Sequence, residues 1–345
     1  MNVAQEHFGN PNIEQRNLAE GKAAVNLGAR GIITVSGEDR LAWLHSLLSQ
    51  NLKNLLPGVS AEALLLDPHG HIEQVIHFLD DGETSWLVVE AAGCEPLLAW
   101  LNKMVFRMKV AVADRSADFS VIGHIGAGIP QSFVSNAVAL IWHDPWPGVV
   151  TGGVRYSMAR PAKWAWTESL VEVSKVDAVL AEFEKAGTMA YDALRIAAHR
   201  PRQASEVDGK ALPHEFDWMS TAVHMSKGCY RGQETVAKVH NLGHPPRRLT
   251  FLHLDGSGHF LPDAGDEVHV VGEDRSRGHI TIAAQHFESG PIALALLSRG
   301  VPEDATLVVK SAGGDIDASQ EVIVPASAGK AADIPNRNLL MGGKH

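Results

Sequence analysis

The residues best suited to chemistry lie together in one stretch, Lys227-Gly228-Cys229-Tyr230-Arg231-Gly232-Gln233-Glu234. Cys229 stands two residues from the ammonium group of Lys227 and just ahead of a helix that the sequence predicts over 233–240. A nearby cation and a helix N-terminus both favour a thiolate over a thiol, so Cys229 is predicted to be nucleophilic or a soft-metal ligand. The alternative is a buried structural cysteine in a turn bracketed by glycines, because free cysteines are among the most buried residue types.

The neighbours of Cys229 suit a compact binding loop. Gly228 and Gly232 permit tight turns and the close approach of a ligand to the backbone. Tyr230 offers a ring for stacking and a hydroxyl for hydrogen bonding. The stretch therefore predicts a loop that can bring a ligand close to the thiol.

Other candidate sites carry weaker signals. His69-Gly70-His71 has the spacing of a metal site, but it falls in a predicted hairpin turn without nearby cysteines, and zinc sites usually take four ligands. We therefore predict no metal site. Arg247 and Arg248 can either meet the anionic tail of a ligand or lie on a surface strand.

Composition limits the class of protein. The 345 residues carry a formal charge of −10, so we expect no stable nucleic-acid partner. No run of 18 apolar residues is present, which predicts no membrane span, and the first residues do not have the pattern of a signal peptide. Only two cysteines occur, Cys94 and Cys229, which suits a reducing compartment. The sequence thus predicts a soluble, cytoplasmic protein with several domains.

Alternating and helical patterns divide the chain. Residues 1–28 are polar with little periodicity and are predicted to form a flexible arm. Residues 29–125 then read as strand, helix, three strands, helix and two strands, which predicts an N-terminal α+β domain with helices on one face of an antiparallel sheet. A second α+β domain is expected over 126–246, and it includes a long connection after residue 200 that is irregular and therefore a functional candidate.

The last part of the chain changes character. Short strands separated by Gly, Asp and Pro follow Pro245-Pro246, which predicts an antiparallel β-barrel over 247–328. Residues 329–345 are predicted to be a flexible tail.

The motif and its surroundings also resemble a known family. KGCYRGQE is similar to the KGCYxGQE signature of YgfZ-type folate-binding proteins, the iron–sulfur-cluster maintenance relatives of the glycine cleavage T protein. Residues 35–58, 63–72 and 211–218 resemble other regions of that family, and the resemblance covers roughly residues 28–310. It implies a three-domain ring with two mixed α/β domains, antiparallel sheets, a C-terminal barrel and a folate-sized site near the central opening.

The resemblance implies roles for individual residues. Cys229 would be the reactive or ligating thiol, and Lys227 would tune it. Tetrahydrofolate or a folate derivative would be the cofactor, bound by Arg195, Lys227, Gly228, Tyr230, Gly232, Gln233 and Glu234. Iron–sulfur client proteins or assembly factors would be the partners of a monomer, in work that includes tRNA modification. Iron–sulfur clusters normally take four protein thiolates, so a single cysteine implies a transient role.

Two positions depart from the T-protein pattern. Leu97 stands where T proteins have a carboxylate after the strand over 85–90, and Ala197 stands where they carry a pterin-binding glutamate. Without these carboxylates, orientation of the pterin and acid–base help are both weakened. The expected function is therefore support of iron–sulfur cluster assembly or repair. A folate-dependent one-carbon transferase and a non-catalytic adaptor on the same fold remain the alternatives.

Overall fold

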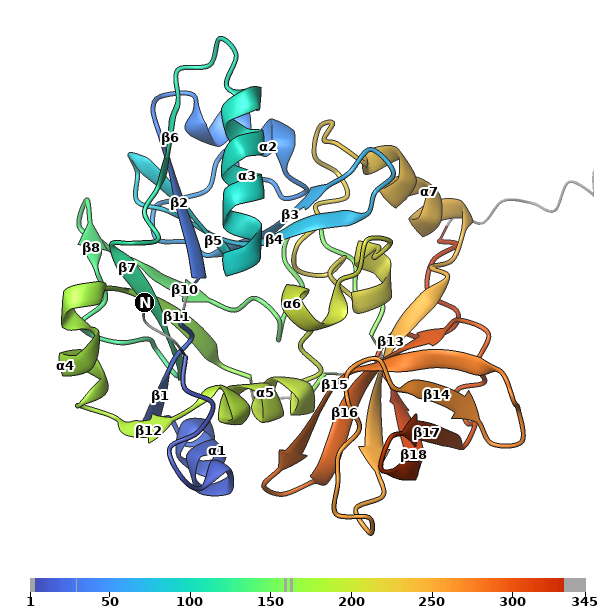
Figure 1. Cartoon of the computed structure of the whole chain (residues 1–345). Coiled ribbons are helices and arrows are strands. Elements are labelled where there is room, and N and C mark those ends of the chain that lie inside the picture. Colours follow the sequence, from blue (N-terminus) through green and yellow to red (C-terminus); the bar gives the residue numbers. More distant parts are fainter. Residues whose placement is uncertain (1–3, 29, 158–159, 162–163, 332–345) are drawn as a thin grey trace, which may run out of the picture.

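A computed structural model describes residues 4–28, 30–157, 160–161 and 164–331. Two five-stranded sheets and a closed six-stranded barrel form its framework, and the connection with α6 and α7 lies among them (Figure 1). The mixed α and β composition, the antiparallel sheets and the C-terminal barrel confirm the predicted fold class. In the described part of the chain, no helix is both long and apolar enough to cross a membrane.

The first sheet has the strand order β3-β4-β5-β2-β6 and is antiparallel throughout. Its strands are β2 (Arg30–Ser36), β3 (Ala61–Leu66), β4 (Ile72–Asp80), β5 (Thr84–Glu90) and β6 (Ala111–Asp114). Helices α2 (Arg40–Leu47) and α3 (Ala91–Met104) pack on this sheet. They bury Leu44, Leu97 and Leu101 against Ile33 and Phe78, which forms a core of its own.

The second sheet has the order β10-β11-β7-β1-β12, in which β1 and β12 are parallel. Its strands are β1 (Ala23–Asn26), β7 (Phe119–Ile125), β10 (Ile141–His143), β11 (Trp166–Glu172) and β12 (Glu184–Ala186), beside a small hairpin of β8 (Val134–Ser135) and β9 (Val138–Ala139). Helices α1 (Pro11–Ala19), α4 (Val176–Leu180, after the 3-10 turn η1, Val173–Lys175) and α5 (Thr188–Ala197) accompany it.

The N-terminal segment differs from the predicted flexible arm over residues 1–28. Residues 11–19 form α1, whose first amides Asn10 caps through its side chain, and residues 23–26 form β1 in the second sheet. Leu18 and Val25 are fully buried. Because only a few apolar residues anchor this segment to the core, it has no clear helical or strand periodicity in the sequence. We had expected the strand over 119–125 to belong to the first sheet. It is β7 of the second sheet instead.

The C-terminal barrel closes in the order β13-β16-β15-β14-β17-β18. Its strands are β13 (Arg247–Leu254), β14 (Glu267–Val270), β15 (Ser276–His286), β16 (Gly290–Ser298), β17 (Leu307–Ser311) and β18 (Gly314–Val322). Alternate residues such as Leu252, Ala293 and Val309 fill the interior. Of the predicted tail over 329–345, residues 332–345 lie outside the described residues.

The long connection after residue 200 contains α6 (Gln203–Glu206), the 3-10 turn η2 (Pro213–Phe216) and α7 (Gln233–Leu242). Residues 211–223 are buried without exception, and they include Trp218 and Thr221. This irregular segment is therefore part of the protein interior, where its polar groups bond to Glu62 of the first sheet and to Arg247 of the barrel.

Candidate functional site

The KGCYRGQE segment forms a loop that leads into α7. Gly232, the residue before the helix, has a left-handed φ of 81°. A Cβ atom at this position would lie 2.5 Å from the carbonyl oxygen of Asp67 in the β3–β4 turn. The predicted helix over 233–240 is present. The close contact at Gly232 is with the hairpin of the first sheet, and the approach of a ligand to this backbone stays a prediction.

Within this loop, Cys229 is an exposed free thiol. The residue is not the buried structural cysteine of the alternative interpretation. Arg231, two positions later, pairs with Glu73 at 2.7 Å and places its guanidinium 5.7 Å from the ring centroid of Trp100 on α3. The thiol is thus displayed at the surface next to the first sheet and its helix.

Lys227 reaches from the motif loop to the end of α2. Its side-chain nitrogen donates to the carbonyl oxygens of His45, Leu48 and Gln50, where α2 ends. An ammonium group has three hydrogens to donate, and these three carbonyls account for all of them. Burial lowers the pKa of Lys227 to about 8. The contacts describe a clamp between the loop and α2, and tuning of the thiol by Lys227 stays a prediction.

The remaining motif residues divide between interior and surface. Tyr230 is buried beneath the Lys227 nitrogen, which lies 5.0 Å from its ring centroid, and burial raises the pKa of Tyr230. Gly228 and Glu234 are exposed, and Gln233 is half-buried. Tyr230 therefore supports the loop from inside.

Arg195, the one predicted folate-binding residue outside the motif, is fully buried on α5. Its guanidinium pairs with Asp192 at 2.7 Å and with Glu206 at 3.2 Å. It also donates to the backbone oxygen of Arg200 and to Ser205. These bonds tie α5 to α6, so the structure does not bring Arg195 to the motif loop or to an open surface.

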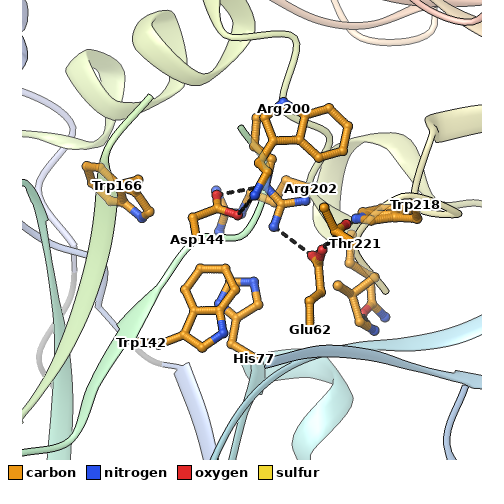
Figure 2. A network of polar contacts seen from close by, with 12 residues as sticks. Glu62, His77, Trp142, Asp144, Trp166, Arg200, Arg202, Trp218 and Thr221 are labelled. Atoms are coloured by element: carbon orange, nitrogen blue, oxygen red, sulfur yellow. Dashed lines mark hydrogen bonds and ion pairs between the residues drawn. The ribbon is translucent and has the colours of Figure 1, made fainter. Parts of the chain in front are cut away.

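A buried network that we did not predict joins the two sheets (Figure 2). Glu62 on β3 accepts hydrogen bonds from Arg200 at 2.6 Å, Thr221 at 2.6 Å and Trp218 at 3.2 Å. Arg200 also pairs with Asp144, at 2.9 Å, from the residue that follows β10. Arg200 thus links the first sheet, through Glu62, to the end of β10 in the second sheet, and Glu62 extends the network to the long connection.

The same region contains a histidine–carboxylate pair. His77 on β4 contacts Glu168 on β11 at 2.7 Å through Nδ1 and stacks on Trp142 with a centroid separation of 3.7 Å. Burial alone would raise the pKa of Glu168, but His77 and Arg30 outweigh it and lower that pKa to about 2. Glu90, paired with Arg30 and Arg202, likewise has a pKa lowered to about 2 against the effect of burial.

These side chains surround a cavity of about 20 Å³, which we call the central chamber. It is lined by Arg30, Glu62, His77, Glu90, Asp144, Glu168, Tyr191, Arg200 and Arg202, among others. Nε of Arg30 and Nη1 of Arg200 find no hydrogen-bond acceptor among the described residues. A chamber of this volume holds about one water molecule, so it is too small for a pterin.

A larger groove lies beside the chamber. One lobe of about 650 Å³ is lined by α1, α5 and the β15–β16 turn, and it includes Arg16, Glu20, Ala197, Phe287 and Glu288. A second lobe of about 610 Å³ shares Ala19, Ile125 and Trp164 with the first and reaches Asp144 and Trp166 at the chamber. We call the two lobes the central groove. Neither lobe is lined by a residue from 227–234.

The two departures from the T-protein pattern fall in different surroundings. Leu97 is 1% exposed in the core of the first sheet, among Leu44, Leu101 and Phe78. Ala197 lines the central groove. Position 197 therefore faces a ligand-sized space with a methyl group, whereas position 97 faces none.

Two weaker candidates make ion-pair contacts within the fold. His71 bonds to Asp67 at 2.9 Å within the hairpin turn, and in the described ranges no three His, Cys, Asp or Glu residues are placed to hold a metal ion. Arg247 pairs with Asp208 and Glu215.

Comparison with known proteins places the chain among distant relatives. No protein-family model matches it. It is 22% identical over 284 residues to the tRNA-modifying protein YgfZ of Escherichia coli, which covers 77% of this chain and 82% of that protein. The iron–sulfur cluster assembly factor IBA57 homologue of Mycosarcoma maydis is 25% identical over 239 residues, 65% of this chain and 55% of its own length.

The solved structure of glycine cleavage system aminomethyltransferase T from Bartonella henselae superposes with a TM-score of 0.72. The match covers 95% of this chain and 92% of that one at 15% identity, which establishes the fold. The chain therefore has the fold of the T protein and is similar in sequence to YgfZ. A chloroplast protein of Arabidopsis thaliana described as a putative transferase is 25% identical over 264 residues, 72% of this chain. The chain spans only about 60% of that protein's length.

The motif was found from sequence, but the chamber was missed. Glu62, His77 and Glu168 lie within strands whose residues are mostly buried, AEALLL, IEQVIHFLD and WTESLVE. Charged residues at positions where a strand should be buried are a usable signal, because such residues need partners.

Proposed function

We propose that this protein binds a tetrahydrofolate-type molecule and supports the assembly or repair of iron–sulfur clusters through Cys229. The observation that carries the proposal is the exposed thiol of Cys229 in a loop whose neighbouring residues are anchored. The sequence similarity of the chain to YgfZ and to the IBA57 homologue supports the same proposal. The two free thiols suit a reducing compartment, and we propose the cytoplasm.

The central groove is the proposed folate site. Its lobes have the size of ordinary ligand pockets, whereas the motif loop lines neither lobe. Phe287 offers an aromatic contact, the carboxylates of Glu20 and Glu288 can accept from pterin N–H groups, and Arg16 can meet the glutamate tail. The residues present therefore fit a folate, which would supply a one-carbon carrier at the groove.

Cys229 is proposed to act with a partner. One thiolate supplies a quarter of the ligands that a cluster usually takes. The described residues provide no cluster of metal-binding side chains beside it. A client or carrier protein must complete any ligation, so the contact with Cys229 is expected to be transient.

The transferase alternative has less support. Leu97 is in a hydrophobic core and Ala197 presents a methyl group to the groove, so neither position can move a proton. Turnover of tetrahydrofolate by the purified protein would overturn this preference.

Two measurements test the proposal. Titration of tryptophan fluorescence with tetrahydrofolate should show a saturable change, and its absence would favour an adaptor. In a strain that lacks the gene, Cys229→Ser should fail to restore the activity of an iron–sulfur enzyme, whereas Cys94→Ser, at the other cysteine, should restore it. Full restoration by Cys229→Ser would refute the role of the thiol.

A further inference from the structure

One face of α3 and the residues after it carry apolar side chains that are partly or largely exposed. Trp100 and Met104 are one turn apart on the helix, and Phe106 follows its end. Met104 is 39% exposed and Phe106 is 87% exposed. Single exposed apolar residues are common on protein surfaces, but Met104 and Phe106 follow Trp100, which is half-buried against the core of the first sheet, and the three form one apolar feature.

Phe106 is also held in an unusual backbone conformation. Its φ of 41° is positive, which is costly for a bulky residue. Strained residues persist where a function or the surrounding structure requires them. Packing does not explain Phe106, because its ring projects into solvent with the guanidinium of Arg107 5.4 Å from its centroid.

The charge of this face is opposite to that of the whole chain. Residues 100–110 contain Lys103, Arg107 and Lys109 and no acidic residue, in a chain of net charge −10. Lys109 is paired with Glu38, whereas Lys103 and Arg107 form no ion pair with any residue that the structure describes. Trp, Met, Phe and Arg are the residues enriched at the centres of protein interfaces.

The face continues to the proposed reactive thiol. The guanidinium of Arg231 lies 5.7 Å from the Trp100 ring, and Cys229 is two residues away, within about 7 Å along the chain. From Trp100 to Met104, where α3 ends, the distance is about 6 Å at helical rise, and Phe106 is two residues farther, within about 7 Å along the chain. A standard interface of about 800 Å² per partner corresponds to a disc of about 16 Å radius, so one partner can cover both ends.

We propose that Trp100, Met104, Phe106, Arg107 and Arg231, the α3 surface, bind an acidic iron–sulfur protein and position it over Cys229. This inference rests on the proposed function and specifies the partner's chemistry. An acidic rim on the partner complements Lys103 and Arg107, and an apolar centre covers Met104 and Phe106. RNA is the weaker occupant, because two unpaired cations supply few of the phosphate contacts that RNA binding requires.

The test uses complementation of a gene-deletion strain, with the activity of an iron–sulfur enzyme as the readout. Phe106→Asp and Arg107→Glu should each lower the restored activity by at least about tenfold, as expected for interface centres. Val271→Asp is the matched control, because Val271 is 56% exposed but lies on the barrel, and its activity should stay within about twofold of wild type. All variants should keep wild-type urea unfolding and reaction of Cys229 with a disulfide reagent.

The outcomes separate this inference from the proposed function. If Cys229→Ser fails while Phe106→Asp and Arg107→Glu restore activity, the docking proposal is refuted and the role of the thiol stands. If Cys229→Ser restores activity, the proposed function fails first. A photo-crosslinking amino acid at position 106 should capture an acidic iron–sulfur protein, identified by mass spectrometry, and Arg107→Glu should remove the adduct. An adduct with RNA or with a second copy of this chain would overturn the proposal.

Discussion

Replacing Lys227 with methionine separates a clamp from a tuner of the thiol. Methionine keeps most of the side-chain volume but removes the three hydrogen bonds to the carbonyls of His45, Leu48 and Gln50. Hydrogen bonds from a charged donor contribute roughly 1.5–3 kcal/mol each, and three of them together about 4.5–9 kcal/mol. Burial of the ammonium, which lowers its pKa from 10.5 to about 8, costs about 3 kcal/mol.

The difference between these effects predicts that Lys227→Met lowers the free energy of unfolding by about 3 kcal/mol. Urea unfolding followed by tryptophan fluorescence measures it, with Cys229→Ser as the control because an exposed substitution changes stability by about 0.5 kcal/mol or less. A loss below about 1 kcal/mol for Lys227→Met, together with a slower reaction of Cys229 with a disulfide reagent, would contradict the clamp and restore the tuning role.

Three further predictions follow from the site. Gly232→Ala should lower the free energy of unfolding by more than about 2 kcal/mol, because a Cβ would lie 2.5 Å from the Asp67 oxygen. Gly265→Ala is the control, because Gly265 has a φ of 97° but open space around it, so the substitution measures the backbone strain alone. Equal losses of stability in the two variants would contradict the effect of the Asp67 contact. Glu90 and Glu168 have pKa values lowered from 4.5 to about 2, so each stabilises the fold above pH 4.5 by roughly 3 kcal/mol, which is lost as the pH falls toward 2. Acid unfolding should therefore be shallower in Glu168→Gln, and an unchanged profile would argue against the lowered value. Ala197→Glu should tighten tetrahydrofolate binding about tenfold or more in a fluorescence titration if the groove is the folate site, and unchanged affinity would place the ligand elsewhere.

Much of the fold could be predicted because periodicity reports burial. The strands at 61–66, 72–80 and 84–90, the helix after Gly232 and the C-terminal barrel are all strongly patterned. Residues 11–26 were not predicted as structure, because α1 is mostly polar and β1 is only four residues long. These elements are stabilised by contacts with residues far along the chain, and a local sequence pattern does not predict such contacts.

The candidate site was predicted in part for a related reason. Sequence proximity placed Lys227 next to Cys229, but the lysine is drawn to the unpaired carbonyls at the end of α2, some 180 residues earlier. Arg195 was predicted as a ligand contact from the resemblance, and its buried partners Asp192 and Glu206 are visible only once α5 and α6 pack together. Spacing along the chain identifies candidate groups but not the direction in which they point.

The parallel pairing of β1 with β12 has a consequence for the order of synthesis. Ala23 pairs with Glu184, so a nascent chain must grow by about 160 residues before β1 finds that neighbour. At roughly 5–20 residues per second, this wait is about 8–30 seconds, during which the intervening first sheet can already close. β1 can pair with β7 about 100 residues after its own synthesis, but it gains its second neighbour only once residues 184–186 have been made.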